Sequence, residues 1–137
     1  MVDAERAGAR LQRLEELLER LGEVREEGET AYLSDAVVRA ATERRLEIAV
    51  QICIDLGTQL ATERSVRPPD SYADVFQKLA EAELLTPELA RRLSEAARQR
   101  NLLVHLYMEI EDRKVFTSLQ SLDDLREFAK IVEAHLD

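Results

Sequence analysis

The sequence predicts an all-α protein, an antiparallel bundle of about five helices. Apolar residues at spacings of three and four recur through most of the chain, which is the periodicity of amphipathic helices. Aromatic residues make up only 4% of the sequence, and Leu, Ala, Glu and Arg, which favour helices, are abundant. A length of 137 residues is that of one domain, so we expect residues 1–137 to form a single domain with short helix connections.

The first predicted helix covers residues 4–27. Its apolar residues form a narrow stripe, and the opposite face is rich in glutamate. Gly28 follows the last apolar position and predicts the end of the helix. The stripe consists of Ala7, Leu11, Leu14, Leu18 and Leu21.

The second and third predicted helices cover residues 34–63 and 72–83. Ser34 is a suitable N-cap for the second helix. Asp55 lies beside the apolar stripe of this helix with no cation near it in the sequence. A carboxylate in that position needs a partner from elsewhere in the fold. The two prolines within residues 67–70 separate the two helices because consecutive prolines cannot continue a helix.

The fourth predicted helix begins with the strongest start signal in the chain. Thr86, Pro87 and Glu88 have the residue types of an N-cap, a first helical position and an acidic first turn. The apolar periodicity then continues to about Met108.

A mixed-charge loop is expected at residues 111–117, and a last helix follows it. Ser121 and Asp124 are spaced as a capping pair, so we expect this helix to run from Ser121 to about His135. His135 is expected to be frayed and to take no part in function.

Composition and charge restrict the function classes. A net charge of −9 argues against an open, non-specific nucleic-acid surface, although a small basic site remains compatible with it. Cys53, the single cysteine, lies in an apolar run and is expected to be buried and inert. The chain has no signal-peptide pattern and no apolar stretch long enough to span a membrane, so we expect a cytoplasmic protein.

Arg100 breaks the pattern of the fourth helix. It falls in line with Leu93 and Ala96, at a position where a leucine would continue the apolar stripe. A guanidinium on an apolar face is costly unless it has a carboxylate partner or faces a cleft. Such local inconsistencies are expected at functional sites.

His105 follows Arg100 by five residues, about 140° around an ideal helix, whereas Asn101 and His105 share a face. Three arrangements bring the first two together: the Arg100 side chain wraps around, the helix is distorted, or two copies of the helix meet. Leu102, His105 and Leu106 form a second partly apolar face, which favours a dimer contact.

The segment from Arg100 to Tyr107, Arg-Asn-Leu-Leu-Val-His-Leu-Tyr, resembles the R-x4-H-x-Y signature of HepT proteins, a branch of the HEPN superfamily. Two upstream segments are also similar to the family's pattern. These are Arg39 with the helix that contains residues 52–55, and the Pro-Asp-Ser-Tyr stretch at residues 69–72. The best-matched core is residues 34–136, and the first helix matches least.

The resemblance implies a HEPN fold, a homodimer and the toxin of a type VII toxin–antitoxin system. It implies a metal-independent endoribonuclease that needs no cofactor, with Arg100 and His105 catalytic and Asn101 supporting them; we add Asp55 as a second supporting residue. It also implies a nucleotidyltransferase antitoxin, similar to MntA, that attaches AMP to Tyr107.

Several alternatives remain open from the residues alone. Asp55 could neutralise Arg100 while His105 packs in an interface, and Tyr107 could simply be buried with its hydroxyl bonded. The chain could also be a non-catalytic adaptor that presents substrate to a nucleotidyltransferase, or a coiled-coil interaction protein. Three further arginines could guide RNA or be ordinary solvated charges: Arg91, Arg92 and Arg98.

Overall fold

The computed structural model describes residues 4–64, 70–105 and 111–136, and within the helix that ends at residue 105 it leaves the side chains of residues 102, 104 and 105 undescribed. All regular structure in these ranges is helical, as predicted, with two short helices added to the five expected. The elements are α1 (Ala4–Glu27), α2 (Glu29–Leu33), α3 (Ala36–Glu63), α4 (Asp74–Glu81), α5 (Pro87–His105), α6 (Asp112–Ser118), the 3₁₀ turn η1 (Leu119–Ser121) and α7 (Leu122–Ala134).

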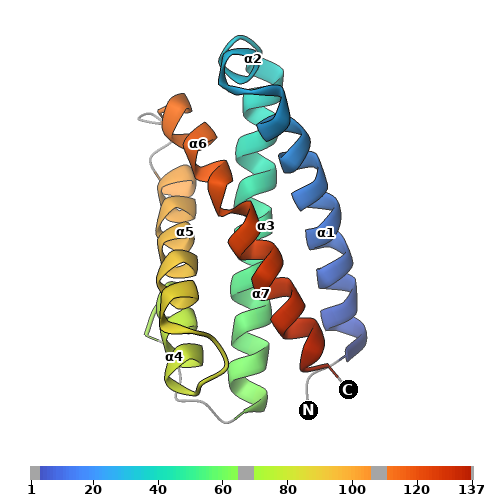
Figure 1. The fold of residues 1–137 in the computed structure, drawn as a ribbon, viewed down its shortest axis with the longest axis vertical. Coiled ribbons are helices and arrows are strands. Elements are labelled where there is room, and N and C mark those ends of the chain that lie inside the picture. The colour runs from blue at the N-terminus through green and yellow to red at the C-terminus, as the bar shows by residue number, and fades with distance from the viewer. Residues whose placement is uncertain (1–3, 65–69, 106–110, 137) are drawn as a thin grey trace.

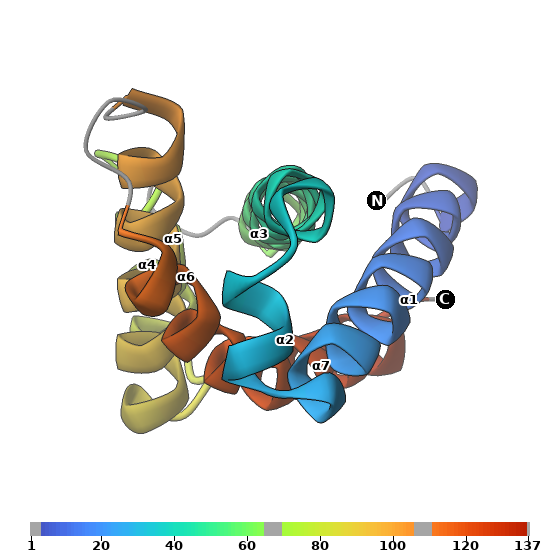
Figure 2. The ribbon, with the colours of Figure 1, turned by 90° about the horizontal axis from the view of Figure 1, so that it is seen from above.

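Helix α3 is the centre of the bundle. It contacts α1 and α7 on one side and α4 and α5 on the other, and it runs antiparallel to α1 and α5 (Figure 1). Viewed from above, α3 lies between the two groups (Figure 2). This position explains why the C-terminal half of α3 is apolar around most of its circumference. Cys53 on α3 is fully buried, as expected, and burial raises the pKa of its thiol.

Helix α1 has the bounds that its periodicity predicted. Four of the five stripe residues are buried, Leu11 is half-buried, and Leu17 adds to the buried face. Gly28 ends the helix with a φ of 93°, a left-handed conformation that glycine adopts without strain. None of the described helices is both long and apolar enough to cross a membrane.

The start of α3 differs from the prediction by one capping residue. Asp35, not Ser34, is the N-cap, because its carboxylate accepts hydrogen bonds from the backbone N–H groups of Val37 and Val38 at 3.0 and 3.1 Å. The Ser34 hydroxyl instead donates to carbonyl oxygens of α2. The Ser34 side chain therefore bonds to α2, a helix that the sequence did not predict, and does not cap α3.

The predicted loop at residues 111–117 is wrong, because these residues form most of α6. Val115 is buried, and the ring of Phe116 contacts the buried ring of Tyr32 on α2, with 5.5 Å between ring centroids. These contacts hold a helix of only seven residues that its own sequence could not stabilise.

The start of α7 also differs from the prediction. Ser121 does not cap α7 with its side chain, and its hydroxyl donates to the carbonyl oxygen of Ser118 at 2.7 Å. Asp124 forms an ion pair with Arg92 at 3.4 Å instead of completing a capping box. At the other end His135 is half-buried, with Nδ1 2.8 Å from the Ile131 carbonyl oxygen. The expectation that His135 is frayed is therefore wrong.

Candidate functional site

Helix α5 carries most of the predicted site, and it begins as the sequence predicted. The Thr86 hydroxyl accepts a hydrogen bond from the backbone N–H of Leu89 at 3.2 Å, and Pro87 is the first helical residue. Hydrogen bonding and charge attraction from Arg91 lower the pKa of Glu88 in the first turn. The start of α5 is thus fixed locally by its cap.

The buried face of α5 leads directly to Arg100. Arg100 is half-buried and continues this face by one turn from Ala96 and Ala97. The guanidinium therefore enters a largely apolar setting, as the sequence indicated. The buried residues that precede it on α5 are Leu89, Ala90, Leu93, Ser94, Ala96 and Ala97.

Arg100 has an unusual set of contacts for a half-buried cation. Its Nε atom is buried and has no hydrogen-bond partner among the described residues. Its Nη1 donates to the Asn101 side-chain oxygen at 3.3 Å, and its Cζ lies over the Tyr72 ring, 6.0 Å from the centroid. Over the described ranges the structure shows no ion pair between Arg100 and a carboxylate. An unsatisfied buried nitrogen calls for an explanation, and a guanidinium is suited to binding an anion.

Asp55 has a different partner from the one considered for it. Its Oδ1 accepts a hydrogen bond from the Gln51 amide at 2.9 Å on the same helix. Within residues 4–64, 70–105 and 111–136, no ion pair joins Asp55 to Arg100. The alternative in which Asp55 neutralises Arg100 is thus not observed, and a supporting role for Asp55 stays a prediction.

Three arrangements would bring Arg100 and His105 together. Helix α5 is uninterrupted to His105, so a local distortion of the backbone does not bring these residues together. The Arg100 guanidinium reaches the side chain of Asn101, which precedes His105 by one helical turn. Whether the Arg100 side chain wraps around or two copies of the helix meet stays a prediction. The His105 side chain and all of Tyr107 lie outside the described residues.

The three arginines proposed to guide RNA are exposed, and each has a carboxylate partner. Arg91 and Arg92 both pair with Glu88, at 2.7 and 3.2 Å. Arg98 pairs with Glu95 at 3.3 Å. These local pairs offset the positive charge that phosphates would meet, so the three side chains together form only a weak basic surface.

A groove of about 970 Å³ runs between α5 and the α6–η1–α7 segment. Gln99 and Leu103 line it near the end of α5, and Val115 lines it from α6. Its mixed charge does not indicate a phosphate channel. Its charged residues are the basic Arg91, Arg92 and Lys114 and the acidic Glu95, Glu111, Asp123 and Asp124.

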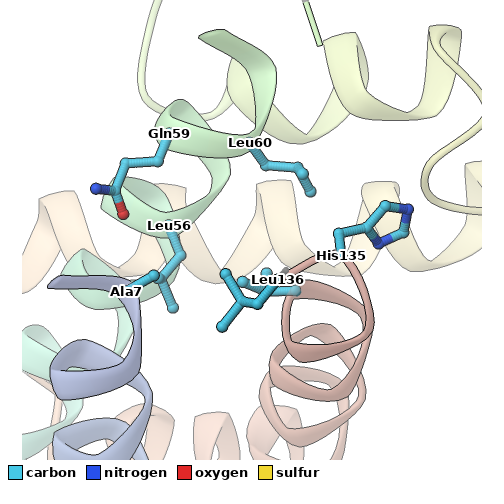
Figure 3. Close-up of a pocket in the computed structure, with 7 residues that line it drawn as sticks. Ala7, Leu56, Gln59, Leu60, His135 and Leu136 are labelled. Carbon is cyan, nitrogen blue, oxygen red and sulfur yellow. The ribbon is translucent and has the colours of Figure 1, made fainter. Parts of the chain in front are cut away.

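A second pocket lies at the other end of the bundle, between α1, α3 and α7 (Figure 3). Leu56, Gln59 and Leu136 line it beside His135, and its volume is about 10 Å³, enough for about one water molecule. None of the predicted site residues lines it. Over the described residues, no three His, Cys, Asp or Glu side chains are grouped as metal ligands.

Tyr72 is the site residue that sequence reasoning missed. Helix α4 begins at Asp74, later than the predicted residue 72, and leaves Tyr72 in the preceding turn, where its ring reaches Arg100 on α5. These two residues are far apart in the sequence, so no local pattern joins them. The only signal was the position of Tyr72 in the second matched segment.

Comparison with known proteins identifies the family. A family model described as "Ribonuclease HepT-like" matches residues 14–132. A protein of Aphanizomenon flos-aquae named tRNA nuclease HepT is 31% identical over 88 residues, which cover 64% of this chain and 60% of the relative. A protein of Shewanella oneidensis named mRNA nuclease HepT is 26% identical over 104 residues, 75% of this chain and 78% of the relative.

A solved structure has the same fold. It is that of a tri-AMPylated Shewanella oneidensis HEPN toxin in complex with an MNT antitoxin, and it matches with a TM-score of 0.86 at 24% identity. The match covers 98% of this chain and the whole of that one. A match over 98% of the chain includes α1, which the sequence resemblance did not cover.

Proposed function

The chain belongs to the HepT-like ribonuclease family, and from this premise we propose that it is a metal-independent endoribonuclease. The proposal depends on Arg100, a half-buried guanidinium that has neither a partner for its Nε nor a neutralising carboxylate within the part of the chain that the structure describes. Arg100 directly precedes Asn101, and Asn101 and His105 lie on one face of the same helix. This combination suits a phosphodiester held beside an imidazole.

RNA provides the nucleophile for this reaction. His105 accepts the proton of a 2′-hydroxyl, the 2′-oxygen forms a bond to phosphorus, and the bond from phosphorus to the 5′-oxygen breaks. The leaving 5′-oxygen takes a proton from a second acid, for which a second His105 in a homodimer is available. The Arg100 guanidinium binds the non-bridging oxygens as their negative charge grows. No step needs a metal ion or a cofactor.

A paired substitution on α5 tests the role of Arg100. Arg100→Gln is expected to lower the cleavage rate of single-stranded RNA by about 100-fold, because it removes the charge that stabilises the transition state. Arg98→Gln, two residues earlier, removes an exposed and paired arginine and is expected to stay within about threefold of the wild type. Cleavage is followed on labelled RNA in excess chelator, and circular dichroism checks folding.

Two results would contradict the proposal. A wild-type protein that cuts no RNA and does not arrest growth when expressed alone would support the non-catalytic adaptor. Equal losses in the two variants would show that Arg100 contributes only ordinary surface charge. His105→Ala should abolish cleavage while the homodimer persists, as measured by light scattering.

We further propose that the chain is the toxin of a type VII toxin–antitoxin pair and acts in the cytoplasm. Its partner would be an MntA-type nucleotidyltransferase that attaches AMP to Tyr107. Tyr107 follows Arg100 by seven residues in the sequence, and we infer that a phosphate attached there would occupy the guanidinium in place of RNA. Co-expression with the partner should add adenylyl mass to the wild type and none to Tyr107→Phe. If the wild type and Tyr107→Phe both gain adenylyl mass, the modified residue is not Tyr107.

A further inference from the structure

Tyr72 is an exposed aromatic ring beside Arg100, whose guanidinium has no carboxylate partner among the described residues. It is 54% exposed and, with Val37, one of two large apolar side chains that are exposed in the described ranges. Arg100 lies over its ring at 6.0 Å from the centroid. A single exposed apolar side chain is ordinary, but an exposed aromatic ring beside a cation is the combination that holds single-stranded nucleic acids.

The turn that carries Tyr72 is held by side chains on both sides. The Ser71 hydroxyl accepts a hydrogen bond from the Asp74 N–H at 3.2 Å, and the Asp74 carboxylate accepts one from the Asp70 N–H at 2.9 Å. This arrangement is similar to a capping box. It fixes the backbone around Tyr72 before any ligand is present.

The turn is also tied to α5. The hydroxyl of Ser94, which is 1% exposed, donates to the Ala73 carbonyl oxygen at 3.0 Å. This bond holds the turn that carries Tyr72 against α5, the helix that also carries Arg100. Preorganisation of this kind lowers the entropic cost of binding.

We propose that Tyr72 is a nucleobase subsite, on which an unpaired base of the RNA stacks while a neighbouring phosphate contacts Arg100. Single-stranded nucleic acids are commonly held by aromatic stacking combined with cationic phosphate contacts, and each stacked base contributes about 1–3 kcal/mol. The ligand class rests on the proposed ribonuclease function. The subsite selects unpaired nucleotides over duplex, because only an unstacked base can stack on the ring. It discriminates weakly between sequences, because every base has a flat face.

The test separates base stacking from phosphate binding. Wild type and variants are titrated with two short fluorescent oligonucleotides that lack a 2′-hydroxyl nucleophile. One carries 2′-O-methyl adenosines and the other has abasic sugars throughout. Tyr72→Leu is expected to weaken binding of the adenosine oligonucleotide roughly 5- to 150-fold and to leave the abasic one unchanged. Tyr72→Phe keeps the ring and should stay within about twofold of the wild type.

Two controls make the outcome unambiguous. Val37→Thr alters the other exposed apolar side chain and should change neither affinity. Arg100→Gln should weaken both oligonucleotides by the same factor, since both carry phosphates. Tyr72 is exposed, so its variants are expected to fold, which thermal melts would verify.

Either of two results would overturn the subsite. If Tyr72→Leu weakens both oligonucleotides equally, the ring only supports Arg100. If it weakens neither, no base stacks there. Both readouts measure binding, so failure of the wild type to cleave RNA would refute the proposed ribonuclease without deciding the subsite.

Discussion

Tyr32 offers a test of how the α2–α6 contact is stabilised. Its side chain is 1% exposed, and its hydroxyl has no hydrogen-bond partner in the described ranges. A buried polar group left unsatisfied costs about 1–3 kcal/mol. Tyr32→Phe removes that group and keeps the ring contact with Phe116. We therefore expect the variant to be more stable by about 1 kcal/mol at pH 7.

The advantage of Tyr32→Phe should grow at alkaline pH. Burial, followed by the charges of Glu43 and Asp112, raises the pKa of Tyr32 from 10.0 to about 12. Between these values the unfolded chain releases the proton first, so the stability of the wild type falls as pH rises. At pH 11 the loss is about 1.4 kcal/mol, the equivalent of one pKa unit. The variant lacks this loss.

Chemical denaturation at pH 7 and pH 11 measures both effects. Tyr72→Phe serves as a control, because it removes an exposed hydroxyl and should change stability at pH 7 by less than about 0.5 kcal/mol. Tyr32→Phe that is less stable than the wild type at pH 7 would show that the hydroxyl has a partner. Parallel stability curves at the two pH values would show that its pKa is not raised.

Three further substitutions probe the scaffold around the site. Gly57→Ala places a Cβ 2.8 Å from Val75 Cγ1, and this overpacking should outweigh the gain of up to about 1 kcal/mol in helix propensity, so urea denaturation should show a net loss of about 1 kcal/mol. Arg39→Gln removes a 3.4 Å ion pair with Asp112 and should speed hydrogen exchange in α6 more than in α3. Burial and then the charge of Asp112 raise the pKa of Glu43 in the folded protein. The ionised side chain therefore destabilises the fold once the pH exceeds the pKa of Glu43 in the unfolded chain. Glu43→Gln should therefore be more stable at pH 7, and its advantage should disappear in acid.

The long helices could be predicted because their ends are encoded locally. Gly28 and the Thr86–Pro87 pair use capping geometries that depend only on neighbouring residues. The short helices α2 and α6 were missed because five to seven residues contain too few apolar positions to show a period. They form through contacts between distant residues, such as that of Tyr32 with Phe116.

The site was predictable to a similar degree. Arg100 could be found because a cation interrupts an apolar stripe on a single helix, which is a local signal. Its contact with Tyr72 depends on how α4 packs against α5, and nothing in either segment alone predicts it. The capping at Ser34 and Ser121 failed for a related reason, since each hydroxyl is used by a short element that precedes the long helix.

The acidic character of the chain limits how it can bind RNA. A net charge of −9 repels phosphates at long range, and the exposed arginines of α5 are paired with carboxylates at 3.4 Å or less. Affinity must then come from short-range contacts, with Arg100 as the guanidinium without a carboxylate partner on the described part of α5. Each phosphate contact to a single strand contributes about −0.7 to the slope of log K against log salt. A protein that relies on Arg100 and on stacking at Tyr72 should therefore show a shallow slope, between about −0.7 and −2. A slope steeper than about −5 would mean that a broad basic surface binds the RNA, and that the site described around Arg100 is not the main source of affinity.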